Sequence, residues 1–199
     1  MTDNVYEPPK SELIEESDPT SRSFYVVSRK KLLVLYLSTL GLYAIYWFYA
    51  NWQRFRTNSD QKNLWPIPRA IFYIFFTHSL FNWIDSRLKM QNIEFNWAPK
   101  ILATVFVIIT IASNLIDRMA YQQYGSPYTD FASLALLPIT LAVLMKAQKA
   151  INLGQGDPDG DTNSRFTVYN YLWILLGIIL WLLILFGLLG TLGVIYIPE

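Results

Sequence analysis

The chain has 199 residues, of which 53% are hydrophobic and 16% aromatic, and its formal net charge is +1. The mean hydropathy of +0.25 is too high for an ordinary soluble domain, and the balanced charge excludes a typical nucleic-acid-binding protein. The absence of cysteine excludes disulfides, thiolate catalysis and Cys-ligated metal centres. We therefore predict an all-α integral membrane protein with four to five membrane-embedded helices.

The first 23 residues carry acidic side chains and prolines but almost no apolar side chains that could be buried. Such a composition is typical of a disordered acidic tail. The remainder, residues 24–199, is expected to form a single helical membrane domain.

The first membrane segment is expected at residues 32–52, an uncharged run of about 32 Å as a helix, long enough to cross a hydrocarbon core of roughly 30 Å. Cations flank it on both sides, and its second half is crowded with tyrosine and tryptophan. Because such rings collect where acyl chains meet headgroups, this half is expected to lie at a membrane interface.

A second, strongly aromatic segment is expected at residues 67–84, with Pro66 and Pro68 in its first turn. Its uncharged part, residues 70–84, is only about 22 Å long as a helix, which is short for a span. An interfacial or re-entrant helix explains this segment as well as a true span does.

Three further segments, at about residues 98–117, 131–150 and 169–197, are each predicted to span the membrane. The turn at residues 121–130 contains no Lys or Arg, which favours the outer side, whereas Lys146 and Lys149 favour the cytoplasmic side.

The topology of the front half has three solutions. Five spans with a cytoplasmic N-terminus would leave Arg54, Arg56, Lys62 and Arg69 outside, against the positive-inside rule. If only the first segment spans, the cluster at residues 29–31 lies outside instead. In the third solution each front segment enters and returns, with a break at residues 38–41, although lipid-exposed backbone at such a break is costly. We rank five spans slightly ahead.

Several motifs resemble a family of uncharacterised bacterial multi-pass membrane proteins defined by a domain of unknown function. The motifs are Ser28 with Lys30-Lys31, Thr39-Leu40-Gly41-Leu42-Tyr43-x-x-Tyr46-Trp47-Phe48-Tyr49-x-Asn51-Trp52, Arg69-Ala70-Ile71-Phe72, Leu80-Phe81, and Asn163-Ser164-Arg165-Phe166-Thr167 with Asn170. The resemblance covers nearly the whole chain. It implies a multi-pass protein of the bacterial inner membrane and no assigned reaction.

Catalytic chemistry has little support in the sequence. His78 is the only histidine, and although Asp85 shares its helical face and a proton relay is conceivable, a histidine bonded to a headgroup or backbone is the stronger interpretation. No nucleophile elbow, phosphate loop or zinc-protease motif occurs. We expect no enzymatic activity and no catalytic, cofactor-binding or metal-binding residue.

The loop at residues 157–163 has oxygen-bearing side chains at alternate positions, as a calcium loop does. Position twelve of such a loop would be Val168, so the bidentate carboxylate is missing. A polar turn that caps the last helix through Asn163 or Ser164 is the better interpretation.

Polar groups near the helix ends are candidates for a transport pathway, namely Asn114, Asp117, Arg118, Lys146 and Lys149. Terminal lysines usually extend to the interface instead, and none of these residues is expected at the bilayer midplane. The glycines at positions 187, 190 and 193 permit close helix packing or oligomerisation.

The concentration of cations and aromatic rings in the front half favours lipid contacts. The candidate contacts are Arg29, Lys30, Lys31, Tyr43, Tyr46, Trp47, Trp52, Arg54, Arg56, Arg69, His78 and Trp83. The leading hypothesis is a small non-enzymatic inner-membrane protein that contacts membrane lipids, with a second copy or another membrane protein as a further partner. The alternative is a small transporter or channel subunit. No nucleic-acid partner and no cofactor are expected.

Overall fold

A computed structural model describes residues 22–194, so the predicted acidic tail lies almost entirely outside the described residues. Within them the chain forms seven α-helices and one 3-10 helix, and no strand. The elements are α1 (Arg29–Ser38), α2 (Tyr43–Thr57), α3 (Pro66–Ile71), α4 (Tyr73–Met90), α5 (Pro99–Tyr121), α6 (Tyr128–Gly154), η2 (Asp161–Asn163) and α7 (Val168–Thr191).

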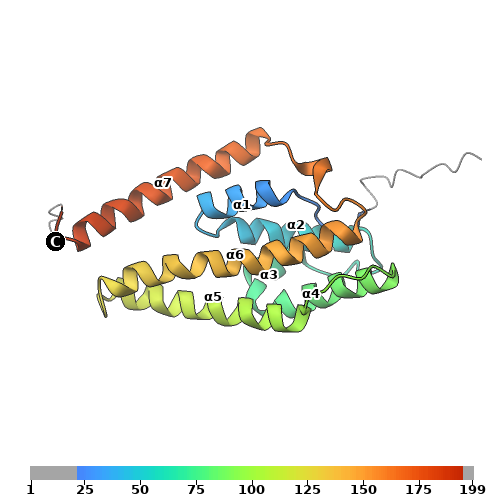
Figure 1. Cartoon of the computed structure of the whole chain (residues 1–199), viewed down its shortest axis with the longest axis horizontal. Coiled ribbons are helices and arrows are strands. Elements are labelled where there is room, and N and C mark those ends of the chain that lie inside the picture. The colour runs from blue at the N-terminus through green and yellow to red at the C-terminus, as the bar shows by residue number, and fades with distance from the viewer. Residues whose placement is uncertain (1–21, 195–199) are drawn as a thin grey trace, which may run out of the picture.

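Three helices, α5, α6 and α7, are long and apolar enough to span a membrane, which confirms the three segments predicted in the second half of the chain. They are fewer than the four to five helices expected. Helices α5 and α6 form an antiparallel pair, and the turn between them lies at the same end of the molecule as the end of α7 (Figure 1). We call this the turn end. The opposite end, which carries the loops at residues 58–65, 91–98 and 155–167, is the loop end.

The first predicted segment, residues 32–52, is not one helix, and that prediction was wrong. Helix α1 stops at Ser38, and the chain turns through Leu40 and Gly41, whose φ angles are 54° and 86°, before α2 begins. The Thr39 hydroxyl stabilises the turn, because it accepts a bond of 3.0 Å from the N–H of Tyr43 and donates one of 2.7 Å to the carbonyl of Leu35. Helices α1 and α2 therefore form a hairpin with its tip toward the turn end (Figure 1).

The second predicted segment, residues 67–84, is also divided. The short helix α3 ends at Ile71, Phe72 has non-helical angles of −97° and 38°, and α4 then runs on to Met90, well past the predicted end. Both halves of the front region therefore begin and finish near the loop end (Figure 1). The break of the first segment at residues 38–41 is the one that the third topology requires.

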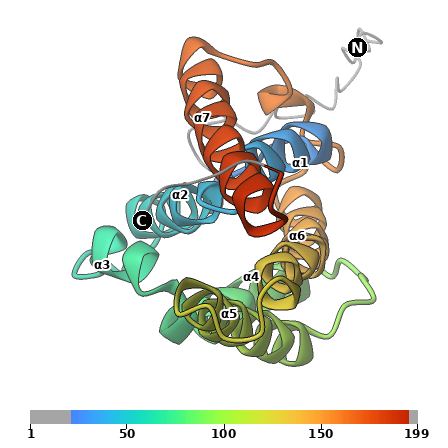
Figure 2. The same ribbon diagram turned by 90° about the vertical axis from the view of Figure 1, so that its left-hand side faces the viewer.

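The tip of the first hairpin reaches only part of the way along the spanning helices. A Cβ atom added at Gly41 would lie 3.2 Å from Leu137, which is in the first half of α6 when counted from the turn end. Helix α7 packs against α1, and Figure 2 shows it well apart from α5. The tip is covered only in part, because Leu40 and Gly41 are half-buried and Leu42 is 43% exposed.

The extended segment at residues 22–28 has no neighbouring strand, and side-chain amides satisfy its backbone instead. Asn51 accepts from the N–H of Tyr25 at 3.1 Å, Gln148 donates to the carbonyl of Tyr25 at 2.9 Å, and Asn152 donates to that of Val27 at 3.0 Å. All three amide residues are completely buried. Because a buried unpaired amide is costly, this network fixes the segment against α2 and α6.

Candidate functional site: a cationic groove between α1 and α6

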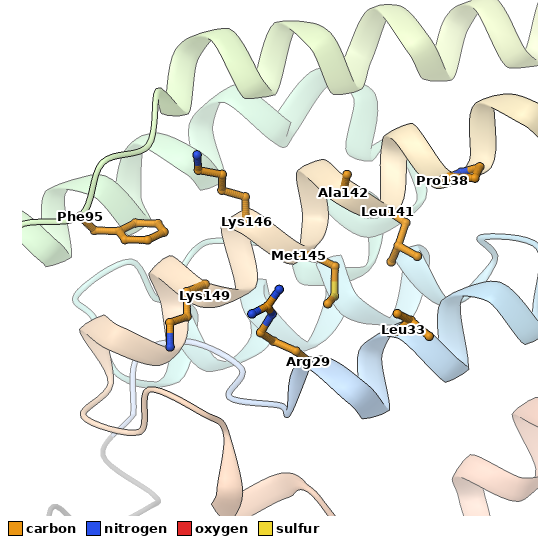
Figure 3. A pocket seen from close by; sticks show the side chains of 9 residues that line it. All are labelled: Arg29, Leu33, Phe95, Pro138, Leu141, Ala142, Met145, Lys146 and Lys149. Atoms are coloured by element: carbon orange, nitrogen blue, oxygen red, sulfur yellow. The ribbon is translucent and has the colours of Figure 1, made fainter.

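A groove of about 480 Å³ lies between the start of α1 and the second half of α6 (Figure 3). The cations and Phe95 lie toward one end of it, and the other apolar side chains lie toward the opposite end (Figure 3). Its lining consists of Arg29, Leu33, Phe95, Pro138, Leu141, Ala142, Met145, Lys146 and Lys149. We call this the α1–α6 groove.

Helical spacing explains how the groove is built. The α6 residues that line it, from Pro138 to Lys149, recur at intervals of three and four, which places them on one helical face. On the other side, the Ser28 hydroxyl accepts from the N–H of Lys31 at 3.3 Å and so caps α1, which makes Arg29 the first helical residue.

Two of the three cations in the groove are free to bind a ligand. Within residues 22–194, neither Arg29 nor Lys146 makes a hydrogen bond or ion pair, and both are exposed. Lys149 is partly engaged, because its Nζ donates to the carbonyl of Pro158 at 3.0 Å and lies 3.5 Å from the Asp159 carboxylate. The groove therefore keeps a positive charge that an anion would balance.

The groove crosses the expected edge of the hydrocarbon core. Helix α6 has 27 residues and is about 40 Å long, which exceeds a core of roughly 30 Å, and its last residues lie at the loop end. The cations are close to that end, whereas Pro138 and Leu141 lie one to three turns deeper. Such a gradient fits an amphiphile with an anionic head and an apolar tail.

Four predicted lipid contacts are buried inside the protein, which corrects that prediction for them. Tyr43, Trp47 and Trp52 are completely buried, and Lys31 is 2% exposed. The ammonium of Lys31 donates to the side chain of Asn163 and to the carbonyl of Arg165, both at 2.7 Å. These residues hold the fold together instead of facing lipid.

The other predicted contacts lie at or near the surface, but only Arg29 lines the α1–α6 groove. The guanidinium of Arg69 lies 4.6 Å from the centre of the Trp52 ring and 4.9 Å from that of Phe76, while Arg54 lies over Tyr25 at 6.0 Å. The remaining members of the set are Lys30, Tyr46, Arg56, His78 and Trp83.

His78 and Asp85 each form hydrogen bonds or ion pairs with other residues and not with each other. His78 pairs with the hydroxyl of Thr104 at 3.0 Å, and Asp85 accepts from the indole of Trp97 at 3.1 Å and pairs with Lys89 at 2.7 Å. The two side chains hold α4 against α5 and against Trp97, two residues before α5 begins, so no relay between them is formed.

Asp157 organises the loop that was compared with a calcium site. Its carboxylate accepts from the N–H of Asp161 at 2.9 Å and from the N–H and hydroxyl of Thr162, and it pairs with Arg22 at 3.4 Å. Burial raises the pKa of Asp157, but these hydrogen bonds and the nearby guanidinium outweigh it and lower the pKa below the usual range. The cap of α7 is Thr167 with Asn170, not Asn163 or Ser164 as predicted.

Some of the polar residues suggested for a transport pathway share a second cavity, of about 240 Å³, beside the tip of the first hairpin. Of the candidates, Asn114 and Asp117 line it, together with Thr110, Thr140 and Gly41. Arg118, Lys146 and Lys149 do not.

The apolar part of the α1–α6 groove was missed by sequence reasoning, which singled out only its cations. The missed residues are Leu33, Phe95, Pro138, Leu141, Ala142 and Met145. The spacing of the α6 members gave a usable signal, because they share a face with Lys146 and Lys149. No sequence signal indicated that α1 packs beside α6, since this packing depends on the reversal of the chain at Leu40 and Gly41.

No protein-family model, no curated protein and no solved structure matches the chain. The resemblance to a family of bacterial membrane proteins therefore stays a prediction, and the function is inferred from geometry alone.

Proposed function

We propose that the protein is a non-enzymatic component of the bacterial inner membrane that binds an anionic phospholipid in the α1–α6 groove. The single observation that carries this proposal is that the unengaged side chains of Arg29 on α1 and Lys146 on α6 line one groove together with apolar residues. A phosphate would lie between the two cations, and an acyl chain would lie along Leu141 and Pro138.

The first hairpin supports this function because it brings Arg29 of α1 to the same groove as Lys146 and Lys149 of α6. In this proposal the loop end is cytoplasmic, which places Arg29, Lys146 and Lys149 on the side where the positive-inside rule expects them. The cytoplasmic leaflet is also rich in anionic lipid, and each basic residue near it contributes about 1 kcal/mol.

Neutralising the two unengaged cations should abolish the preference for anionic lipid. For an Arg29→Gln/Lys146→Gln variant we expect phosphatidylglycerol binding to weaken roughly 30-fold, since two contributions of about 1 kcal/mol each are lost. Native mass spectrometry of the purified protein with equal amounts of phosphatidylglycerol and phosphatidylcholine measures this preference.

The matched control is Lys30→Gln/Lys62→Gln, which removes two exposed cations at the loop end but outside the groove. It should retain the wild-type preference. Equal loss in both double variants would mean that the attraction is a general property of the surface charge, and the proposed site would be wrong.

A further inference from the structure

A third cavity, of about 250 Å³, lies at the loop end, between the end of α2, the end of α4 and the segment before α1. It is separate from the α1–α6 groove, with which it shares no lining residue. Its walls are formed by Phe24, Phe55, Asn58, Trp83, Arg87 and Met90, and the loop at residues 59–61 forms its rim. We call it the loop-end cavity.

The loop-end cavity lies beyond the start of the spanning helix α5. The bond between Asp85 and Trp97 sets these two residues at one level, and α5 begins two residues after Trp97. Arg87 and Met90 follow Asp85 in α4 and lie about 3 and 8 Å farther along its axis, in the direction away from α5. Arg87 and Met90 therefore lie farther toward the loop end than the start of α5.

Arg87 is the one cation that lines this cavity, and its charge is unbalanced. Within residues 22–194 its side chain forms no ion pair or hydrogen bond, and its Nε is buried without a partner. A guanidinium without an acceptor is suited to bind a carboxylate.

Aromatic rings form the wall next to this guanidinium. Phe55 stacks on Phe24 with ring centres 5.6 Å apart, and it contacts Trp83 with centres 4.9 Å apart. Trp83 is still 40% exposed, so its ring presents a free surface. Asp60, at the rim, is also exposed and would repel a ligand of high negative charge.

We propose that the loop-end cavity binds a small water-soluble organic anion, with one carboxylate on a planar apolar body. The carboxylate pairs with Arg87, and the body lies against Trp83 and Phe55. The bound anion supplies the acceptor that the guanidinium lacks, and the ring wall excludes water from the pair. This site is independent of the lipid proposed for the α1–α6 groove.

The experiment is a ¹⁹F NMR titration of the full chain in detergent with 4-fluorobenzoate and with its neutral analogue 4-fluorobenzamide. Empty micelles correct for partition of the probes. We expect saturable binding of 4-fluorobenzoate and at least 10-fold weaker binding of the amide. Arg87→Gln should weaken the benzoate at least 10-fold, and Trp83→Leu should weaken it several-fold.

Lys89→Gln is the matched control, because Lys89 lies on the same helix but is exposed and paired with Asp85. It should bind the benzoate as the wild type does. If Arg87→Gln does not fold, the comparison of benzoate with benzamide on the wild type still decides. Equal affinity for the two probes, no saturation, or displacement of the probe by phosphatidylglycerol would each overturn the proposal.

Discussion

Replacing Gly177 by alanine is expected to lower the thermal stability more than any other single methyl group added in α7. A Cβ at this position would lie 2.0 Å from the carbonyl oxygen of Ser38 and 2.5 Å from its carbon. Both are backbone atoms at the end of α1, so neither moves aside without shifting the helix. Overpacking of this kind costs about 3 kcal/mol, or roughly 10 °C in melting temperature.

This contact matters because it joins α7 to the first hairpin. Near it, the indole of Trp181 donates to the carbonyl of Leu37 at 3.0 Å, in the last turn of α1, where carbonyls lack partners within the helix. Gly177 is one of only two buried residues among those described in α7. A shift there would separate the two helices.

Gly187→Ala is the control on the same helix, because nothing lies within 4 Å of a Cβ added at that position. Its melting temperature should equal or slightly exceed that of the wild type, since alanine favours the helix. Thermal unfolding in detergent, followed by circular dichroism, compares the two variants. A Gly177→Ala protein as stable as Gly187→Ala would show that α7 does not pack on α1 as described.

Replacing Gly160 by alanine should have the second large effect. Gly160 has a φ of 72°, and an added Cβ would lie 2.5 Å from the carbonyl carbon and oxygen of Val27. The left-handed backbone alone costs about 1–2 kcal/mol, and the contact with backbone adds to it. We expect a total loss of about 3 kcal/mol.

Gly156 separates these two contributions. Its φ is 70°, nearly the same, but nothing lies within 4 Å of an added Cβ. Gly156→Ala should therefore lose only the conformational part, about 1–2 kcal/mol. Chemical denaturation measures the free energy of unfolding of both variants. Equal losses of this free energy in Gly156→Ala and Gly160→Ala would contradict the contact between the 155–167 loop and the segment before α1.

The second half of the fold could be predicted from the sequence because α5, α6 and α7 are long, apolar runs with few competing solutions. The front half was predicted only in part: a break at residues 38–41 stood among the three topologies, but five spans ranked ahead of it, because the break depends on Leu40, which adopts a positive φ that leucine rarely takes. No glycine pair or proline marks that reversal, and the run looks continuous.

The crowding of aromatic residues in α2 was misleading for a related reason. Large rings suit both a membrane interface and a protein interior, and composition does not distinguish the two. Trp47 is buried because its indole donates to Gln148 at 2.6 Å, a partner 101 residues away. That partner lies between Lys146 and Lys149 in the sequence, where a polar residue suggests a helix end instead of a buried network.

The central claim is that the chain before α5 enters the membrane and returns to the loop end, and cysteine accessibility tests it most directly. The chain has no cysteine, so Ser59→Cys, Ser126→Cys and Ser164→Cys each introduce a single thiol. In intact cells, a membrane-impermeant maleimide should label Ser126→Cys and leave Ser59→Cys and Ser164→Cys protected until lysis. Labelling of Ser59→Cys together with Ser126→Cys would mean that the first segment crosses the membrane, and would contradict the account.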